Sequence, residues 1–155
     1  MMAILISIHP EWCDKILNGE KTVEIRKTKP KLKTPFKCYI YMTKQSKPSK
    51  LGGYVIAEFV CDDIKTISYP YYFVKEDLER AVQGSCVSPQ QLIDYASWKE
   101  KITCVYGWHI SRLKIYENQK CLNEFTMLRS TRFGYESIVA KSAPQSWFYV
   151  EEQAT

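Results

Sequence analysis

Two long segments with the composition of β-strands constrain the fold of this chain more than any other feature. They read YVIAEFVCDDIKTI (residues 54–67) and CVYGWHISRLKIYE (residues 104–117), and Gly107 interrupts the second. Both are rich in the β-branched and aromatic residues that strands favour. Two helical segments, at residues 75–82 and 88–98, lie between them, and there is no regular alternation of strands with helices. This order predicts an α+β fold with a small barrel-like sheet and flanking helices.

The remaining segments complete the predicted sheet around one short helix near the N-terminus. Four further runs are strand-like: ILISI (4–8), TVEIRK (22–27), FKCYIYMT (36–43) and SWFYVEE (146–152). HPEWCDKILNG is predicted to be a helix, because Pro10 suits its first position and Gly19 can end it in a left-handed conformation. KCLNEFTMLR (120–129) is expected to be helical or irregular. The 155 residues contain no repeat and no linker, so we expect a single domain, residues 1–155.

The sequence favours a cytoplasmic protein without a membrane segment, a metal or a cofactor. No window of about 18 apolar residues exists, and the start MMAILISIHP lacks a basic region and a cleavage site. Six scattered cysteines without a C-x-x-C pair indicate reduced thiols. His9 and His109 have no third ligand at metal-binding spacing, and no glycine-rich phosphate loop occurs. The oligomeric state stays open.

The positive charge of the chain is concentrated in one block. The net charge is +5, yet residues 26–50 hold nine basic residues and no acidic one. Such a block attracts polyanions, and we expect its first lysines to contact nucleic acid: Lys27, Lys29, Lys31 and Lys33. The alternative is that these lysines only keep an exposed loop in solution.

The segment GEKTVEIR (19–26) places charges where a strand face should be apolar. Glu24 and Arg26 share one face of the predicted strand, and Val23 and Ile25 share the other. A charged face cannot enter the core unless its charges are paired. We therefore expect Val23 and Ile25 to pack inside the barrel, and the charged face to line a polar cleft with Lys21. The alternative is a surface salt-bridge cluster of little energetic value.

The same residues resemble the signature motif of a known domain family. Gly19, Lys21, Glu24 and Arg26 fit G-x-K-x-x-E-x-R, which resembles the signature of the ASCH domain, a relative of the PUA β-barrel. The order of LISIHPEW, YVIAEF, YGWHISRLKIYE and APQSWFYV is similar to that family over about residues 4–151. The resemblance implies a small stand-alone protein of bacterial or prophage type, which binds RNA or a nucleotide in the cleft.

The resemblance assigns roles to the cleft residues. Lys21 and Arg26 would contact a phosphate or a base edge, and Glu24 would accept from an exocyclic amine or orient Arg26. His9 is expected at the rim, and Trp12 is a candidate ligand contact that could stack on a base or instead belong to the core. Three further aromatic residues could stack or instead belong to the core: Tyr39, Tyr41 and Trp147.

The resemblance also implies an alternative, hydrolytic function. Some relatives are amidohydrolases of acetylated cytidine, with a threonine nucleophile at the position of Glu24 and a lysine base at that of Lys21; others are reported to cleave RNA. If this chain were an enzyme, Lys21 and Glu24 would be its catalytic residues. Thr22 lies two residues too early to replace that nucleophile, so hydrolysis by that mechanism is not expected.

Overall fold

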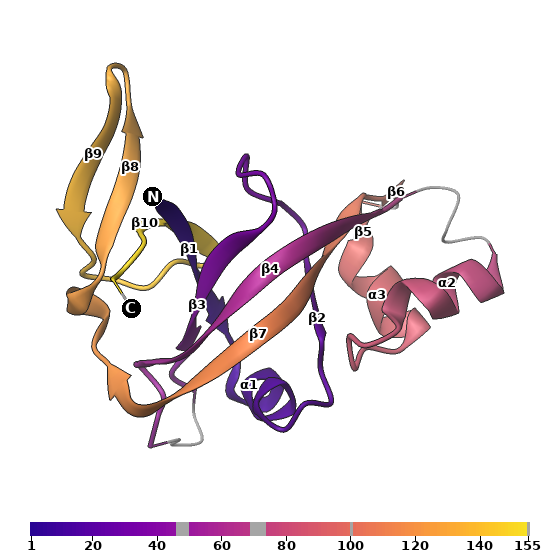
Figure 1. Cartoon of the computed structure of the whole chain (residues 1–155). Helices are drawn as coiled ribbons and strands as arrows, with labels where there is room; N and C mark the ends of the chain where they lie inside the picture. Colours follow the sequence, from indigo (N-terminus) through magenta and orange to yellow (C-terminus); the bar gives the residue numbers. More distant parts are fainter. Residues whose placement is uncertain (46–49, 69–73, 100, 155) are drawn as a thin grey trace.

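The two long strand-like segments form the centre of the sheet. In the computed structural model, which describes residues 1–45, 50–68, 74–99 and 101–154, they become β4 (Val55–Ile67) and β7 (Val105–Lys120), paired antiparallel. Their register shifts at three places, which bends and twists the pair. Figure 1 shows these strands crossing the whole molecule.

Eight strands form one mixed sheet in the order β2-β7-β4-β3-β1-β10-β8-β9. The β1–β3 pair is parallel and the other pairs are antiparallel. A separate two-stranded ribbon pairs β5 with β6. The elements not yet given are β1 (Met2–Ile8), α1 (Pro10–Leu17), β2 (Val23–Arg26), β3 (Phe36–Met42), α2 (Lys75–Val82), α3 (Pro89–Ala96), β5 (Ser97–Trp98), β6 (Lys101–Ile102), the 3₁₀ helix η2 (Leu122–Glu124), β8 (Thr126–Thr131), β9 (Gly134–Val139) and β10 (Trp147–Glu151).

The α+β class with flanking helices is confirmed, but the sheet is not closed into a barrel. The described strands end the sheet with β2 on one side and β9 on the other. β2 has only four residues and forms its ladder with β7. No ladder joins β2 to β1 in the described chain, because both edges of β1 are already paired, one with β3 and the other with β10.

Three apolar clusters hold the layers together. The first packs α1 against one face of the sheet, and β1 contributes Ile4, Ile6 and Ile8 to it. The second covers the other face, where β1 contributes Ala3 and Leu5. The third joins β2 and β7 to α2 and α3. β1 is therefore buried on both faces, which explains its continuous apolar sequence.

The expected place of Val23 and Ile25 needs a correction. Both belong to the third cluster, so they face α2 and α3 and not the interior of a barrel. The loop between these helices is held against β2, because the backbone N–H groups of Thr22 and Val23 both donate to the carbonyl of Gly84, at 2.7 and 3.0 Å. Gly84 has a φ of +80°, and a Cβ there would lie 2.5 Å from Oγ1 of Thr22. The charged face of β2 consequently points the other way, toward β1 and α1.

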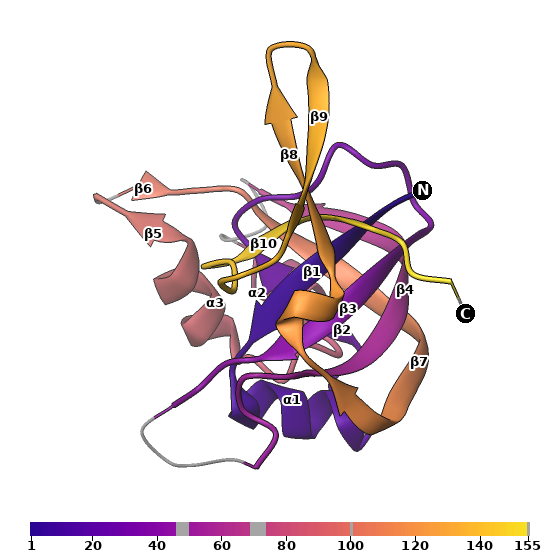
Figure 2. The ribbon, with the colours of Figure 1, turned by 90° about the vertical axis from the view of Figure 1, so that its left-hand side faces the viewer.

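The C-terminal third departs most from expectation. The segment expected to be helical or irregular is the short 3₁₀ helix η2 followed by strand β8. β8 and β9 form a hairpin that the sequence pattern did not predict, and Figures 1 and 2 show it projecting beyond the rest of the sheet. All six cysteines are free thiols. Within the described residues, no helix has the length and apolar character needed to cross a membrane.

Candidate functional site

A pocket of about 730 Å³ lies between β2, the start of α1, helix α3 and the segment before β10. Glu24 and Arg26 of β2 line it, together with Ser7 of β1 and Ser146. It therefore occupies an open seam between the edge strand β2 on one side and the end of β1 with the segment before β10 on the other. This volume is within the range typical of small-molecule sites.

Lys21 lies at the buried end of the pocket, 2% exposed. The turn after α1 positions it, because its backbone N–H donates to the carbonyl of Lys15 at 2.9 Å. Its ammonium donates to the carbonyl of Ser85 at 2.5 Å and lies 4.9 Å from the ring centroid of Trp12. Burial lowers the pKa of Lys21, although the nearby Glu24 carboxylate acts in the opposite direction. Lys21 is thus a shielded cation whose environment disfavours its charged form.

Glu24 is a buried carboxylate, and only one of its two oxygens has a polar partner among the described residues. The residue is 7% exposed, and its Oε1 lies 3.6 Å from Nε of Arg26. Its Oε2 has no hydrogen-bond partner among the residues that the structure describes. On the neighbouring strand its cross-strand partner is Trp108, whose buried Nε1 also lacks a partner within that part of the chain. A buried polar atom without a partner costs free energy, so Oε2 is free to accept from a ligand or a water.

Arg26 spans the seam. One terminal nitrogen donates to the backbone carbonyl of Ser7 at 2.5 Å, and the other donates to Oγ of Ser146 at 3.2 Å. Its side chain is 13% exposed. A guanidinium has five N–H donors, so these contacts leave donors for a ligand. Arg26 therefore links β2 to β1 and to the segment before β10, and also faces the pocket.

His9 and Trp12 both line the pocket. His9 precedes α1, is exposed, and its Nδ1 lies 3.2 Å from Oγ1 of Thr43 and 2.6 Å from Nε2 of Gln45. Trp12 is half-buried beneath the ammonium of Lys21. Tyr39 and Tyr41 belong to the core, the second of the two roles considered for them. Both are buried in the second cluster and cannot stack on a base.

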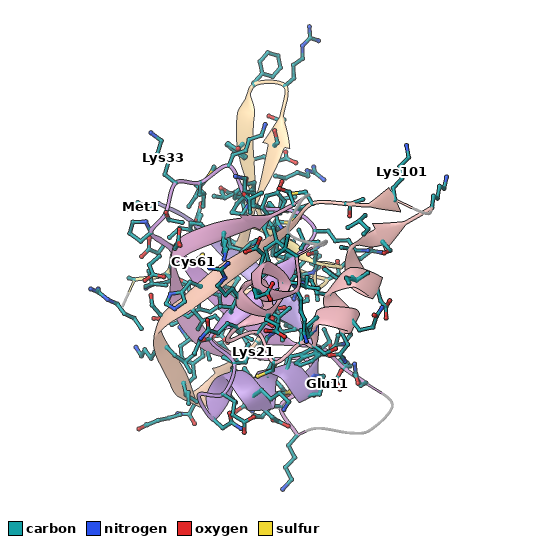
Figure 3. All side chains as sticks on the ribbon, turned by 90° about the vertical axis from the view of Figure 1, so that its right-hand side faces the viewer. Met1, Glu11, Lys21, Lys33, Cys61 and Lys101 are labelled. Carbon is teal, nitrogen blue, oxygen red and sulfur yellow. The ribbon has the colours of Figure 1, made fainter. Side chains whose placement is uncertain are left out.

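The predicted nucleic-acid-binding lysines lie at different distances from the pocket. Lys27 lines it, with its ammonium 4.8 Å from the ring centroid of Tyr95. Lys29 is exposed and lies 5.3 Å from the ring of Tyr106. Lys31 is exposed, and Lys33 lines a second hollow of about 510 Å³. Figure 3 shows Lys33 near Met1 and well away from Lys21.

Two other lysines of the basic block differ from the rest. Lys37 is nearly buried and forms ion pairs with Glu58 and Glu152, both at 3.6 Å, so its charge is balanced within the protein. Lys47 lies outside the described residues.

Several pocket residues were not predicted, and four of them illustrate why, since they come from other parts of the chain. Gln91 and Tyr95 stand four residues apart on α3, and Ser7 and Ser146 flank Arg26. The spacing of Gln91 and Tyr95 places them on one helix face, but nothing local in the sequence shows that this face meets β2. Ser7 and Ser146 could be found only from the pairing of β1 with β10.

Two alternatives for the chemistry of the pocket can be compared with the described residues, a metal cluster and Thr22 as a nucleophile. No group of three potential metal ligands occurs in the part of the chain that the structure describes. Thr22 is exposed and does not line the pocket. Its Oγ1 lies against Gly84, where it is the nearest atom to the position that a Cβ of that glycine would take. Thr22 therefore does not replace the missing threonine.

Known proteins resemble this chain in sequence pattern and in fold. The family model of the ASCH domain matches residues 6–128. The crystal structure of ASCH from Zymomonas mobilis is 21% identical, with a TM-score of 0.65, over 97% of this chain and 88% of that chain. A point mutant of that protein is 20% identical, with a TM-score of 0.65, over 97% and 89% of the two chains. A second point mutant is 21% identical, with a TM-score of 0.60, over 79% and 77%. No curated protein matches the chain. At such identities, likeness to the solved structures shows the shared fold.

Proposed function

Because the chain belongs to the ASCH domain family, whose members are generally thought to bind RNA, we propose that its pocket binds RNA or a nucleotide. Lys21, Arg26 and Lys27 would contact phosphate or base edges, and Glu24 would accept from a base amine. His9 and Trp12 would contact the ligand at the side of α1. No cofactor is needed for this function.

The charge of the pocket supports an anionic ligand. Lys21, Arg26 and Lys27 line it together with one carboxylate, that of Glu24. Arg26 and Lys27 retain donors on the open side, and charge-assisted hydrogen bonds to phosphate are stronger than neutral ones. The half-buried ring of Trp12 and the exposed ring of Tyr95 add apolar surface that a base can contact.

One observation carries the proposal most directly, the unpartnered Oε2 of Glu24. This oxygen is buried beside a guanidinium, so an incoming N–H donor meets a preformed acceptor. Hydrogen bonds to charged groups contribute about 1.5–3 kcal/mol, roughly a 10- to 150-fold change in affinity. A nucleotide that offers an exocyclic amine would satisfy the oxygen without rearrangement of the pocket.

The test is calorimetric titration of wild type and Glu24→Gln with AMP, CMP, GMP, UMP and a short single-stranded RNA. The amide keeps the shape of the carboxylate but replaces one acceptor with a donor. We expect weaker binding of the amine-bearing nucleotides, with UMP changed least. Glu20→Gln is the matched control, because Glu20 is exposed, lies outside the pocket lining and bonds with Lys15 and Asn18 of its own turn. Equal affinities of wild type and Glu24→Gln would contradict the proposal.

A second candidate is a hydrolase acting on a modified nucleoside or on RNA. The observation that favours it is the lowered pKa of buried Lys21 beside Glu24, since a lysine of lowered pKa is a better general base. Lys21 and Glu24 would then be the catalytic pair. The chain has glutamate where the amidohydrolases place their threonine, so an acyl-enzyme cannot form there by their mechanism.

Turnover separates the two candidates. We expect the wild type to release no acetate from acetylated cytidine and to leave single-stranded RNA intact. Glu24→Ala should change ligand affinity without changing that result. Steady turnover by the wild type, lost in Glu24→Ala while the folded signal is retained, would replace binding with catalysis as the function of the pocket.

A further inference from the structure

The β8–β9 hairpin presents an exposed aromatic tip. Phe133 is 94% exposed at the end of the hairpin. The turn is fixed locally, because the N–H of Phe133 donates to Oγ1 of Thr131 at 3.3 Å and that hydroxyl donates to the carbonyl of Gly134 at 3.1 Å. The guanidinium of Arg132 lies 5.9 Å from the ring centroid of Phe133. The tip thus combines an uncovered aromatic face with a positive charge.

A row of aromatic rings connects this hairpin to the pocket. Tyr135, next to the tip and 52% exposed, lies 6.2 Å from the ring of Tyr149. Tyr149 lies 5.4 Å from Trp147, and both are half-buried in β10. The indole Nε1 of Trp147 donates to Oγ1 of Thr28 at 2.9 Å, and Thr28 lines the pocket.

The basic loop follows the same row. The backbone N–H of Lys31 donates to the hydroxyl of Tyr149 at 2.9 Å, which holds the loop against β10. Lys29 and Lys31 are exposed beside that contact, and Lys141 is exposed in the segment between β9 and β10. Arg129 is paired with Glu136 across the hairpin, so the charge of that arginine is balanced within the hairpin.

We infer that these features form one track for single-stranded RNA, which leaves the pocket, follows the aromatic row beside the basic loop and reaches the tip of the hairpin. This inference rests on the proposed function and names its ligand as a strand of several nucleotides. Aromatic side chains stack on unpaired bases and lysines follow the phosphates, which is the usual arrangement in single-strand binding proteins. Each hairpin strand has six residues, which extends the track by about 20 Å.

The test compares short and long RNA on the same variants. We would measure fluorescence anisotropy with labelled single-stranded RNA of about 4 and about 16 nucleotides, the span of known single-strand site sizes. Phe133→Ala, Tyr135→Ala and Arg132→Gln should each weaken binding of the long RNA, the aromatic variants by about 5- to 150-fold. Binding of the short RNA should stay unchanged. All three side chains are exposed, so the variants should fold.

Two matched controls lie away from the track. Lys101→Gln removes an exposed charge from the β5–β6 ribbon, at the opposite end of the molecule in Figure 1. Ile115→Ala removes an exposed apolar side chain from β7, 52% exposed like that of Tyr135. Neither control should change binding of either RNA.

The outcomes separate this inference from the proposed function. If the wild type binds both RNAs and the hairpin variants bind the long RNA as it does, the track is refuted and the pocket proposal stands. If the wild type binds neither RNA nor any mononucleotide, both fail. If Phe133→Ala abolishes self-association in sedimentation while RNA affinity is unchanged, the hairpin is a protein contact and the inference is overturned.

Discussion

Replacement of Arg26 by lysine tests the side-chain link across the open seam of the sheet. The arginine donates to the carbonyl of Ser7 at 2.5 Å and to Oγ of Ser146 at 3.2 Å. Lysine keeps the positive charge, but its single ammonium cannot reproduce a planar group that reaches two acceptors at once. The substitution therefore removes the bridge while the charge of the pocket is kept.

The size of the effect follows from these contacts. A hydrogen bond from a charged donor contributes about 1.5–3 kcal/mol, and lysine can restore at most one of the two. Since the side chain is 13% exposed, solvent screens the contacts little. We expect the free energy of unfolding to fall by about 2–3 kcal/mol. For a chain of this size that corresponds to a melting temperature lower by roughly 4–12 °C.

Thermal and urea unfolding followed by circular dichroism measure the change. Lys27→Gln is the matched control, because the exposed neighbour lines the same pocket without bridging strands. It should change stability by less than about 0.5 kcal/mol. Both variants should weaken RNA binding, but only Arg26→Lys should unfold earlier. Equal melting temperatures for Arg26→Lys and wild type would refute the bridge.

Three further predictions concern pH, backbone strain and salt. Burial raises the pKa of Cys13 and Cys61 to about 12 from 9.0, so the folded state holds these protons longer than the unfolded state. The stability that they contribute is complete below about pH 9 and is lost as pH rises toward 12; pH titration of urea midpoints should show this fall, and an alkaline range without it would contradict the burial of these thiols. Gly84→Ala places a Cβ 2.5 Å from Thr22 Oγ1 at a φ of +80°, so we expect a loss of about 1–3 kcal/mol in urea unfolding; an unchanged midpoint would mean that the loop is not held there. Replacement of Lys29, Lys31 and Lys33 by Gln should reduce the log–log salt slope of single-stranded RNA binding by about 2, whereas an unchanged slope would leave these lysines as solubilising charge.

The parts of the site that lie on β2 and at the ends of α1 could be predicted from the sequence, because their residues are close together along the chain. Alternation along β2 separated Glu24 and Arg26 from Val23 and Ile25, and Pro10 and Gly19 marked the ends of α1. The α+β class followed from the two long strands. These patterns depend on periodicity and on cap chemistry, which act over a few residues.

The partners of these residues could not be predicted, because they depend on tertiary packing. Whether Val23 faces a barrel or a helical layer depends on where α2 and α3 dock, and Gly84 fixes that position from the loop between them. The β8–β9 hairpin was missed because its strands carry charged and small residues, with Arg132 and Phe133 as the two loop residues in place of a common hairpin pair. Nor could the openness of the sheet be predicted, because it depends on the tertiary arrangement that leaves β2 and β9 as the two end strands of the described sheet.

The pairing of the first strand with the last has a consequence for how the protein is made. Arg26 bonds to a serine 120 residues further along the chain, and that serine immediately precedes β10. During synthesis β2 emerges from the ribosome long before this partner exists, so the pocket forms only once β10 has paired with β1. A chain cut short before β10 would keep every residue of the GEKTVEIR segment and still lack the site. Binding in the proposed pocket would therefore require that β10 has been made and has paired correctly with β1, a requirement that a motif confined to one segment would not impose.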